Sequence, residues 1–180
     1  MKKAVKIILI VILVISIIVG SLFIWDLFGF RVSTKSKYYE EVAATDDYLP
    51  TIDSLPEHKS VKYKYYQNSM LAFVSYSYTM IVEYDEAIYN SQKDIAHLPF
   101  ENIDKWTTYD GQENHITTNI DPIELDGFSF KMFSEYYPKE IYFIGTNDET
   151  NQVAYIYFED TDLDVIDMPY STFIRTYCGW

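Results

Sequence analysis

Cysteine is nearly absent from this sequence: its 180 residues include only Cys178, so no disulfide can form within the chain. The chain therefore falls outside the class of small secreted domains that are held together by disulfides. It also has no N-x-Ser/Thr sequon, the acceptor site for N-glycosylation. For an exported domain, both absences favour a bacterial surface over the secretory route of eukaryotes.

Glycine and histidine are scarce, and neither forms a known motif. The six glycines are spread over the chain: Gly20, Gly29, Gly111, Gly127, Gly145 and Gly179. Their spacing excludes a P-loop, a dinucleotide-binding GxGxxG turn and a GxSxG nucleophile elbow. Neither His58, His97 nor His115 has another histidine two to four residues away, so HExxH-type zinc patterns are absent. We therefore expect no cofactor.

Basic residues are also few, with 14 Lys and Arg against 27 Asp and Glu, for a net charge of −13. The first 30 residues hold Lys2, Lys3, Lys6 and Asp26, a sum of +2, so the remainder of the chain carries −15. A field of this sign repels phosphate backbones, and we expect no nucleic-acid partner.

One long hydrophobic run is present, in residues 7–25. As a helix it would span about 28 Å, close to the ~30 Å hydrocarbon core of a bilayer. We expect a transmembrane anchor rather than a cleaved signal peptide. The apolar stretch of a signal peptide is shorter and ends at a small-x-small cleavage site, and Val19 and Ser21 match such a site poorly. The expected organisation is a cytoplasmic tail at 1–6, a transmembrane anchor at 7–25, a juxtamembrane linker at 26–37 and an acidic soluble domain at 38–180.

The flanking charges predict the orientation of this anchor. The three lysines before it favour an amino terminus in the cytoplasm and a domain outside the cell membrane. Lipid is then the partner of residues 7–25. Ser16 and Gly20 form a small-xxx-small pair that lets two helices pack closely. Such pairs are common by chance, and we do not expect a homodimer through them.

Two patterns predict β-hairpins. Residues 70–84 alternate strictly, with apolar or aromatic residues at every even position, which predicts a strand buried on one face. Its length predicts a bend or bulge near its middle, and residues 61–66 are expected to pair with it across a turn at 67–69. Residues 141–146 and 152–159 predict a second hairpin with a five-residue loop. Both of its faces are apolar, so these strands should be central.

The remaining patterns predict shorter elements. Helices are expected at 37–48, 85–98 and 167–177. In the second helix, one face is expected to hold Ile88, Gln92, Ile95 and Ala96. Short strands are expected at 114–120 and 128–133, with turns at Asp121-Pro122 and Asp126-Gly127. The fold class is therefore α+β: an amino-terminal transmembrane helix, then one domain in which helices pack on an antiparallel sheet of four to six strands.

An acidic segment offers the one candidate metal site. Asp160-x-Asp162-x-Asp164 begins like a calcium-binding loop. The pattern then fails, because the sixth position is Val165 rather than glycine and the twelfth is Ser171 rather than glutamate. We interpret the segment as a solvated hairpin end, with a weak calcium site at these three aspartates as the alternative.

Aromatic residues and carboxylates complete the candidates. Eighteen tyrosines and eleven phenylalanines predict a tyrosine-rich β core, with a tyrosine-lined ligand surface as the alternative. Trp106 and Trp180 are expected to pack in the core or at its rim rather than to stack on sugars. Cys178 is expected to be a packed small residue rather than a nucleophile. No catalytic residue is predicted, although paired carboxylates remain open in so acidic a domain.

Two stretches show a resemblance: YSYTMIVEYDEAIYNSQKDI at 76–95 and YPKEIYFIGTNDETNQVAYIYFEDTDLDVI at 137–166. They resemble segments of small, uncharacterised, exported or membrane-anchored proteins of Gram-positive bacteria, and imply the bacterial envelope but no activity. The expected function is a non-enzymatic interaction or accessory domain at the outer face of the membrane, with an envelope protein or polymer as its partner. The alternative is a membrane-tethered hydrolase of cell-wall polymers that uses two carboxylates.

Overall fold

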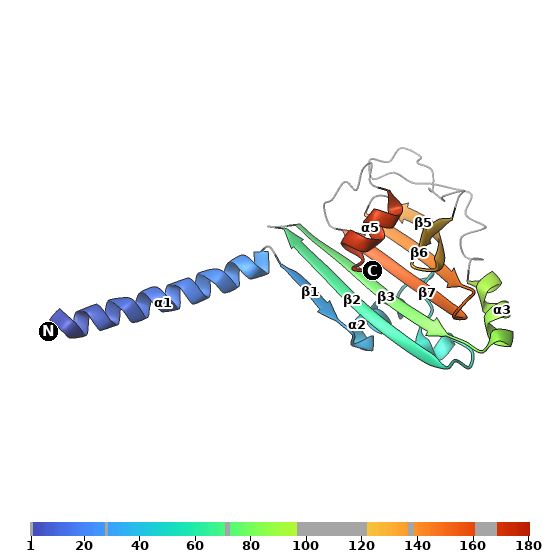
Figure 1. Cartoon of the computed structure of the whole chain (residues 1–180), viewed down its shortest axis with the longest axis horizontal. Coiled ribbons are helices and arrows are strands. Elements are labelled where there is room, and N and C mark those ends of the chain that lie inside the picture. Colours follow the sequence, from blue (N-terminus) through green and yellow to red (C-terminus); the bar gives the residue numbers. More distant parts are fainter. Residues whose placement is uncertain (1, 28, 71–72, 97–121, 137–138, 161–168) are drawn as a thin grey trace.

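The structure, a computed structural model, describes residues 2–27, 29–70, 73–96, 122–136, 139–160 and 169–180. These residues form an α+β fold with a seven-stranded antiparallel sheet and four α-helices (Figure 1). The order of the strands is β1-β2-β3-β7-β6-β5-β4. The α+β class, with helices on an antiparallel sheet, is confirmed, and the sheet has seven strands rather than the expected four to six.

The first helix, α1 (Lys2–Leu27), projects beyond one end of the sheet (Figure 1). Its described aliphatic side chains between Ile7 and Ile24 are 49–65% exposed. Among the described residues, no helix is long and apolar enough to cross a membrane.

Strand β1 (Phe30–Ser33) follows α1 and forms one edge of the sheet, paired with β2 (Ser60–Met70). These four residues lie within the segment 26–37 that was expected to be a linker. Phe30 and Val32 fall on one face of the sheet, and the ring of Phe30 stacks on that of Tyr66 at 6.1 Å. Pairing with β2 therefore extends the sheet almost to the end of α1.

The first hairpin joins β2 to β3 (Phe73–Glu83), with an unbroken register from Ser60↔Glu83 to Met70↔Phe73. The predicted turn at 67–69 is wrong, because these residues belong to β2. The side chains of Gln67 and Ser69 are hydrogen-bonded within the strand, since Gln67 Nε2 donates to Ser69 Oγ at 3.1 Å. The predicted bulge is also wrong: β3 pairs without a shift with both β2 and β7.

The other strands are β4 (Ile123–Leu125), β5 (Phe128–Tyr136), β6 (Glu140–Asn147) and β7 (Gln152–Asp160). The Asp126-Gly127 turn is confirmed, with φ of 51° and 82° between β4 and β5. The second hairpin is also confirmed, and its strands are buried on both faces. Its loop has four residues, since Asn147 pairs with Gln152. The strand expected at 114–120 lies outside the described residues.

The helices divide between the two faces of the sheet. On one face, α2 (Ser36–Ala43), α3 (Glu86–Ile95) and the short 3-10 helix η1 (Ile52–Ser54) accompany the first core, and on the other α5 (Tyr170–Tyr177) covers the second. The expected inner face of α3 is partly wrong, because Tyr89 is buried and Ile95 is 49% exposed. The large ring of Tyr89 thus takes the place nearest the sheet.

Tyrosines dominate the first core, as the composition predicted. Six of them are at most 7% exposed: Tyr39, Tyr84, Tyr89, Tyr142, Tyr155 and Tyr157. The second core, under α5, is built from phenylalanines and aliphatic residues instead. The polar tips of the tyrosines require partners on the first face, whereas the second core requires none.

Candidate functional site

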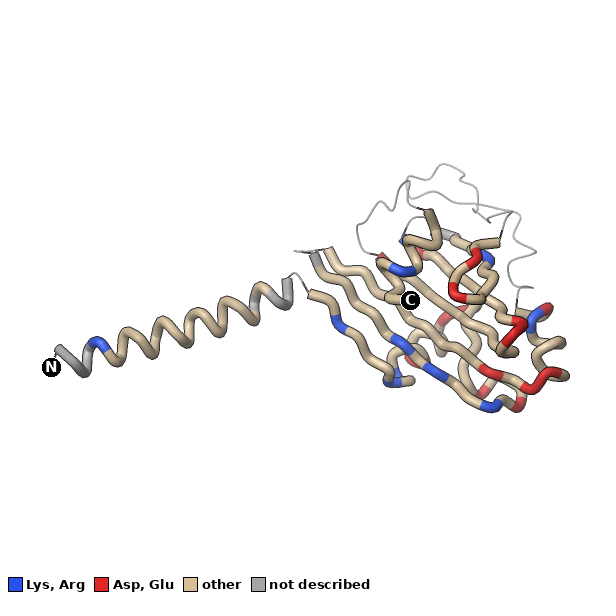
Figure 2. The backbone as a smooth tube through the Cα atoms, viewed as in Figure 1, with Lys and Arg blue, Asp and Glu red and all other residues tan. Residues whose placement is uncertain are grey.

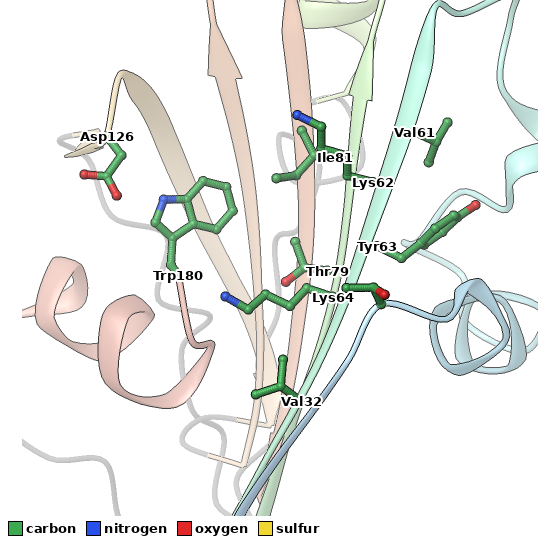
Figure 3. A pocket seen from close by; sticks show the side chains of 10 residues that line it. Val32, Val61, Lys62, Tyr63, Lys64, Thr79, Ile81, Asp126 and Trp180 are labelled. Carbon is green, nitrogen blue, oxygen red and sulfur yellow. The ribbon is translucent and has the colours of Figure 1, made fainter.

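A pocket of about 680 Å³ lies on the face of the sheet that α5 covers, between strands β1–β3 and the carboxyl-terminal residues (Figure 3). Ten of the described residues line it: Val32, Thr34, Val61, Lys62, Tyr63, Lys64, Thr79, Ile81, Asp126 and Trp180. Its volume falls within the range of about 300–1,000 Å³ that is usual for small-molecule sites.

The floor of the pocket follows from the register of β2 and β3. Lys62 lies opposite Ile81 and Lys64 lies opposite Thr79, and opposed residues share a face of the sheet. These four side chains point toward Trp180, whereas Val61 and Tyr63 point to the other face (Figure 3). Alternation along the strand thus brings both lysines to the pocket.

Trp180 forms the facing wall. Its ring meets the rings of Phe128 and Phe130 edge-on, each at 5.1 Å between centroids. Gly179, at φ +61°, precedes it, and a Cβ there would lie 2.6 Å from a ring carbon of Tyr66. Lys64 Nζ donates to the Gly179 carbonyl. The glycine therefore permits the close approach of this segment to β2.

The charge in the pocket is positive. Among the ten described lining residues, Asp126 has the only carboxylate side chain, and Arg175 Nη2 lies 2.7 Å from its Oδ1. No second carboxylate side chain of these ten residues balances Lys62 and Lys64. Basic residues also occur along β1 and β2, while acidic residues gather at other parts of the domain (Figure 2). A cationic pocket therefore lies in a chain whose net charge is −13.

Comparisons with protein-family models, curated proteins and solved structures found no match.

Most residues singled out in the sequence lie away from this pocket. Asp160 is 2% exposed, and its backbone N–H donates to the Lys139 carbonyl. Asp162 and Asp164 lie outside the described residues, as do His97, His115 and Trp106. His58 Nδ1 lies 2.9 Å from the Pro56 carbonyl oxygen. Within the described part of the chain, no three His, Cys, Asp or Glu residues form a group that would hold a metal ion.

Cys178 is part of the second core and is 1% exposed. Burial raises the pKa of its thiol to about 12, although Ser77 and Lys64 act in the opposite direction. The thiol is therefore protonated at neutral pH and is a poor nucleophile. The expectation of a packed small residue is confirmed.

Carboxylates on the opposite face of the sheet accept hydrogen bonds from tyrosines. Phenol hydroxyls donate to carboxylates at 2.7 Å in three pairs: Tyr63 to Glu40, Tyr142 to Asp46 and Tyr89 to Asp148. Hydrogen bonds from Tyr89 and Lys93 lower the pKa of Asp148, the reverse of what a general acid requires. These contacts indicate a structural role for Glu40, Asp46 and Asp148.

Asp46→Ala is expected to destabilise the domain by about 2 kcal/mol, because a carboxylate that accepts several hydrogen bonds is lost. Its Oδ2 accepts from Tyr142, and its Oδ1 accepts the backbone N–H groups of Tyr48 and Leu49 at 2.7 and 2.9 Å. Urea unfolding followed by near-ultraviolet circular dichroism measures the change. Asp47→Ala, at the exposed neighbouring residue, is the matched control and should change stability by less than about 0.5 kcal/mol. Equal losses in the two variants would contradict the role of Asp46.

Proposed function

We propose that this chain is a single-pass, membrane-anchored binding protein without catalytic chemistry, with its domain at the outer face of a bacterial membrane. It takes its ligand or partner in the pocket between β1–β3 and Trp180.

The exposed side chains of α1 support the anchor. Fully burying one leucine or isoleucine is favourable by about 1.5–3 kcal/mol, and the described aliphatic residues of α1 are 49–65% exposed. The side chains of this helix are described without interruption from residue 6 up to residue 22. In the sequence, the uncharged segment continues to residue 25. A bilayer supplies the cover that the domain does not. The three lysines that precede the run support a cytoplasmic amino terminus.

The residues around the pocket support binding over hydrolysis. Glycoside hydrolysis uses two carboxyl groups on either side of the scissile bond, one of them with a raised pKa. The described residues of the pocket lining supply two lysines and a single carboxylate side chain, that of Asp126, which is paired with Arg175. This charge arrangement is the observation that carries the proposal. It gives no support to the alternative of a wall-polymer hydrolase built on paired carboxylates.

Fractionation of bacterial cells that express the full chain tests the anchor. We expect the wild-type protein to stay in the membrane pellet after washes with high salt. Ile12→Arg/Ile15→Arg should move it to the soluble fraction, because arginine at the centre of a spanning helix is among the costliest residues for insertion.

Ile12→Ala/Ile15→Ala is the matched control and should stay in the pellet. Protease added to intact cells should remove the domain if it lies outside. Equal retention of the arginine and alanine variants, or protection of the domain from protease, would overturn the proposed placement.

A further inference from the structure

We propose that the pocket binds an anionic amphiphile, a molecule with one carboxylate or phosphate head on an apolar chain or ring. This proposal rests on the binding role proposed above and names the class of ligand.

The two lysines select an anionic head. Lys64 is held in place by its hydrogen bond to the Gly179 carbonyl. Lys62 is exposed, and its side chain makes no hydrogen bond or ion pair with any residue that the structure describes. Because Asp126 is paired with Arg175, the ammonium groups remain available to a ligand. Charge-assisted hydrogen bonds to carboxylate or phosphate are the strongest that a lysine makes.

A buried hydroxyl gives an independent indication of a polar ligand atom. Thr79 lines the pocket beside Lys64 (Figure 3) and is only 2% exposed. Its Oγ1 has no hydrogen-bond partner among the described residues. Buried polar atoms are nearly always hydrogen-bonded, so this hydroxyl, like those of Ser75 and Ser77 on the same face of β3, calls for a partner beyond the described residues, and in the pocket wall a ligand atom can supply it.

The other walls of the pocket are suited to the apolar part of a ligand. Val32, from the edge strand, is 54% exposed, and it faces the side of the sheet where Trp180 and Ile81 lie (Figure 3). An inorganic anion would leave these three side chains uncovered. An alkyl chain or ring attached to the anionic head would cover them, and removing this apolar surface from water would add to the affinity.

The pocket also lies near the anchor. Val32 is five residues beyond the end of α1 at Leu27, which limits the connection to about 18 Å of extended chain. An amphiphile at the membrane surface is therefore within reach. The ligand could be a lipid of the bilayer or a free amphiphile, because both present the same chemistry.

Trp180 fluorescence tests the proposal on the full chain in nanodiscs of neutral phosphatidylcholine. Trp25→Phe and Trp106→Phe leave Trp180 as the only tryptophan. We expect octyl phosphate and octanoate to give a saturable change in emission. Inorganic phosphate and octanol, which supply the head or the chain alone, should bind at least about tenfold more weakly, a difference of about 1.4 kcal/mol.

Variants locate the site. Lys62→Met should weaken the binding of octyl phosphate about tenfold or more, because one charge-assisted hydrogen bond is lost. Val32→Asp, at an exposed position, should abolish binding by repelling the head and removing an apolar wall. Lys59→Met removes the same charge outside the lining and should leave binding unchanged.

A second set of nanodiscs identifies the source of the ligand. If bilayer lipid fills the pocket, anionic phosphatidylglycerol in the disc will shift Trp180 emission and compete with octyl phosphate. If the ligand is a free amphiphile, the titration will be the same in both discs. Three results would overturn the proposal: no saturable response, equal binding of inorganic phosphate or octanol, or no effect of Lys62→Met. None of these results would alter the outcome of the membrane fractionation.

Discussion

At about pH 11 the domain is expected to unfold, because its buried tyrosines cannot ionise while it is folded. Burial is the largest cause of a raised pKa at each of the six tyrosines in the first core. For Tyr84 the pKa rises to about 12. The hydrogen bond to Asp46 adds to the rise at Tyr142, and the hydrogen bond to Asp148 adds to that at Tyr89.

The sign follows from the protons bound in each state. In the unfolded chain a tyrosine loses its proton near pH ~10, whereas in the folded domain it keeps the proton to a higher pH. Above pH ~10 the unfolded state therefore binds fewer protons, and each tyrosine lowers stability by about 1.4 kcal/mol per pH unit. Six tyrosines together cost about 8 kcal/mol at pH 11, comparable with the 5–15 kcal/mol of a typical domain.

Circular dichroism and the ultraviolet absorbance of tyrosinate, followed together during alkaline titration, measure this transition. We expect part of the absorbance change to appear only as the domain unfolds. Tyr142→Phe is the control: it removes one ionising group, so stability should fall less steeply with pH above ~10. A domain that stays folded while all its tyrosines ionise near pH ~10 would contradict the prediction.

Local patterns in the sequence were sufficient where one element determines the outcome. Alternation in residues 70–84 identified the strand β3 and its apolar face, although the polar face, with Ser75, Ser77 and Thr79, is buried as well. Asp126-Gly127 identified a turn because both residues adopt positive φ. The apolar runs of β6 and β7 identified the centre of the sheet. In each case, a periodicity or a single backbone conformation carries the information.

Elements that depend on distant partners could not be predicted in this way. Gln67 and Ser69 are polar and lie between two strand patterns, so they resembled a turn. They are in β2 because β1 and β3 pair on either side of it. β1 itself is four residues long, and its identity as a strand depends on those partners.

The pocket was missed for the same reason. The alternation of residues 61–66 does place Lys62 and Lys64 on one face of a strand, and this was the one local signal. What makes these lysines part of a site is the approach of Gly179 and Trp180, more than 100 residues later in the chain. No period or motif in the sequence encodes that contact.

Gly145→Val is expected to destabilise the domain by about 4 kcal/mol, above the usual range for overpacking a core. A Cβ at this position would lie 2.4 Å from Cε1 of Phe130, its cross-strand partner on β5. The ring of Phe130 is fully buried, and it packs between Phe128 and the edge of Trp180. It therefore has no open space to move into. Urea unfolding of the full chain measures the loss.

A double-mutant cycle separates this clash from a general intolerance of β6 to substitution. Phe130→Ala alone should cost about 3–5 kcal/mol through the cavity it leaves. Gly145→Val/Phe130→Ala should cost less than the sum of the two by about 1–3 kcal/mol, because the valine fills that cavity. Additive losses would contradict the packing of Phe130 on Gly145. Since Phe130 also supports Trp180, either single change should weaken the binding of octyl phosphate at the pocket, which links the centre of the sheet to the proposed site.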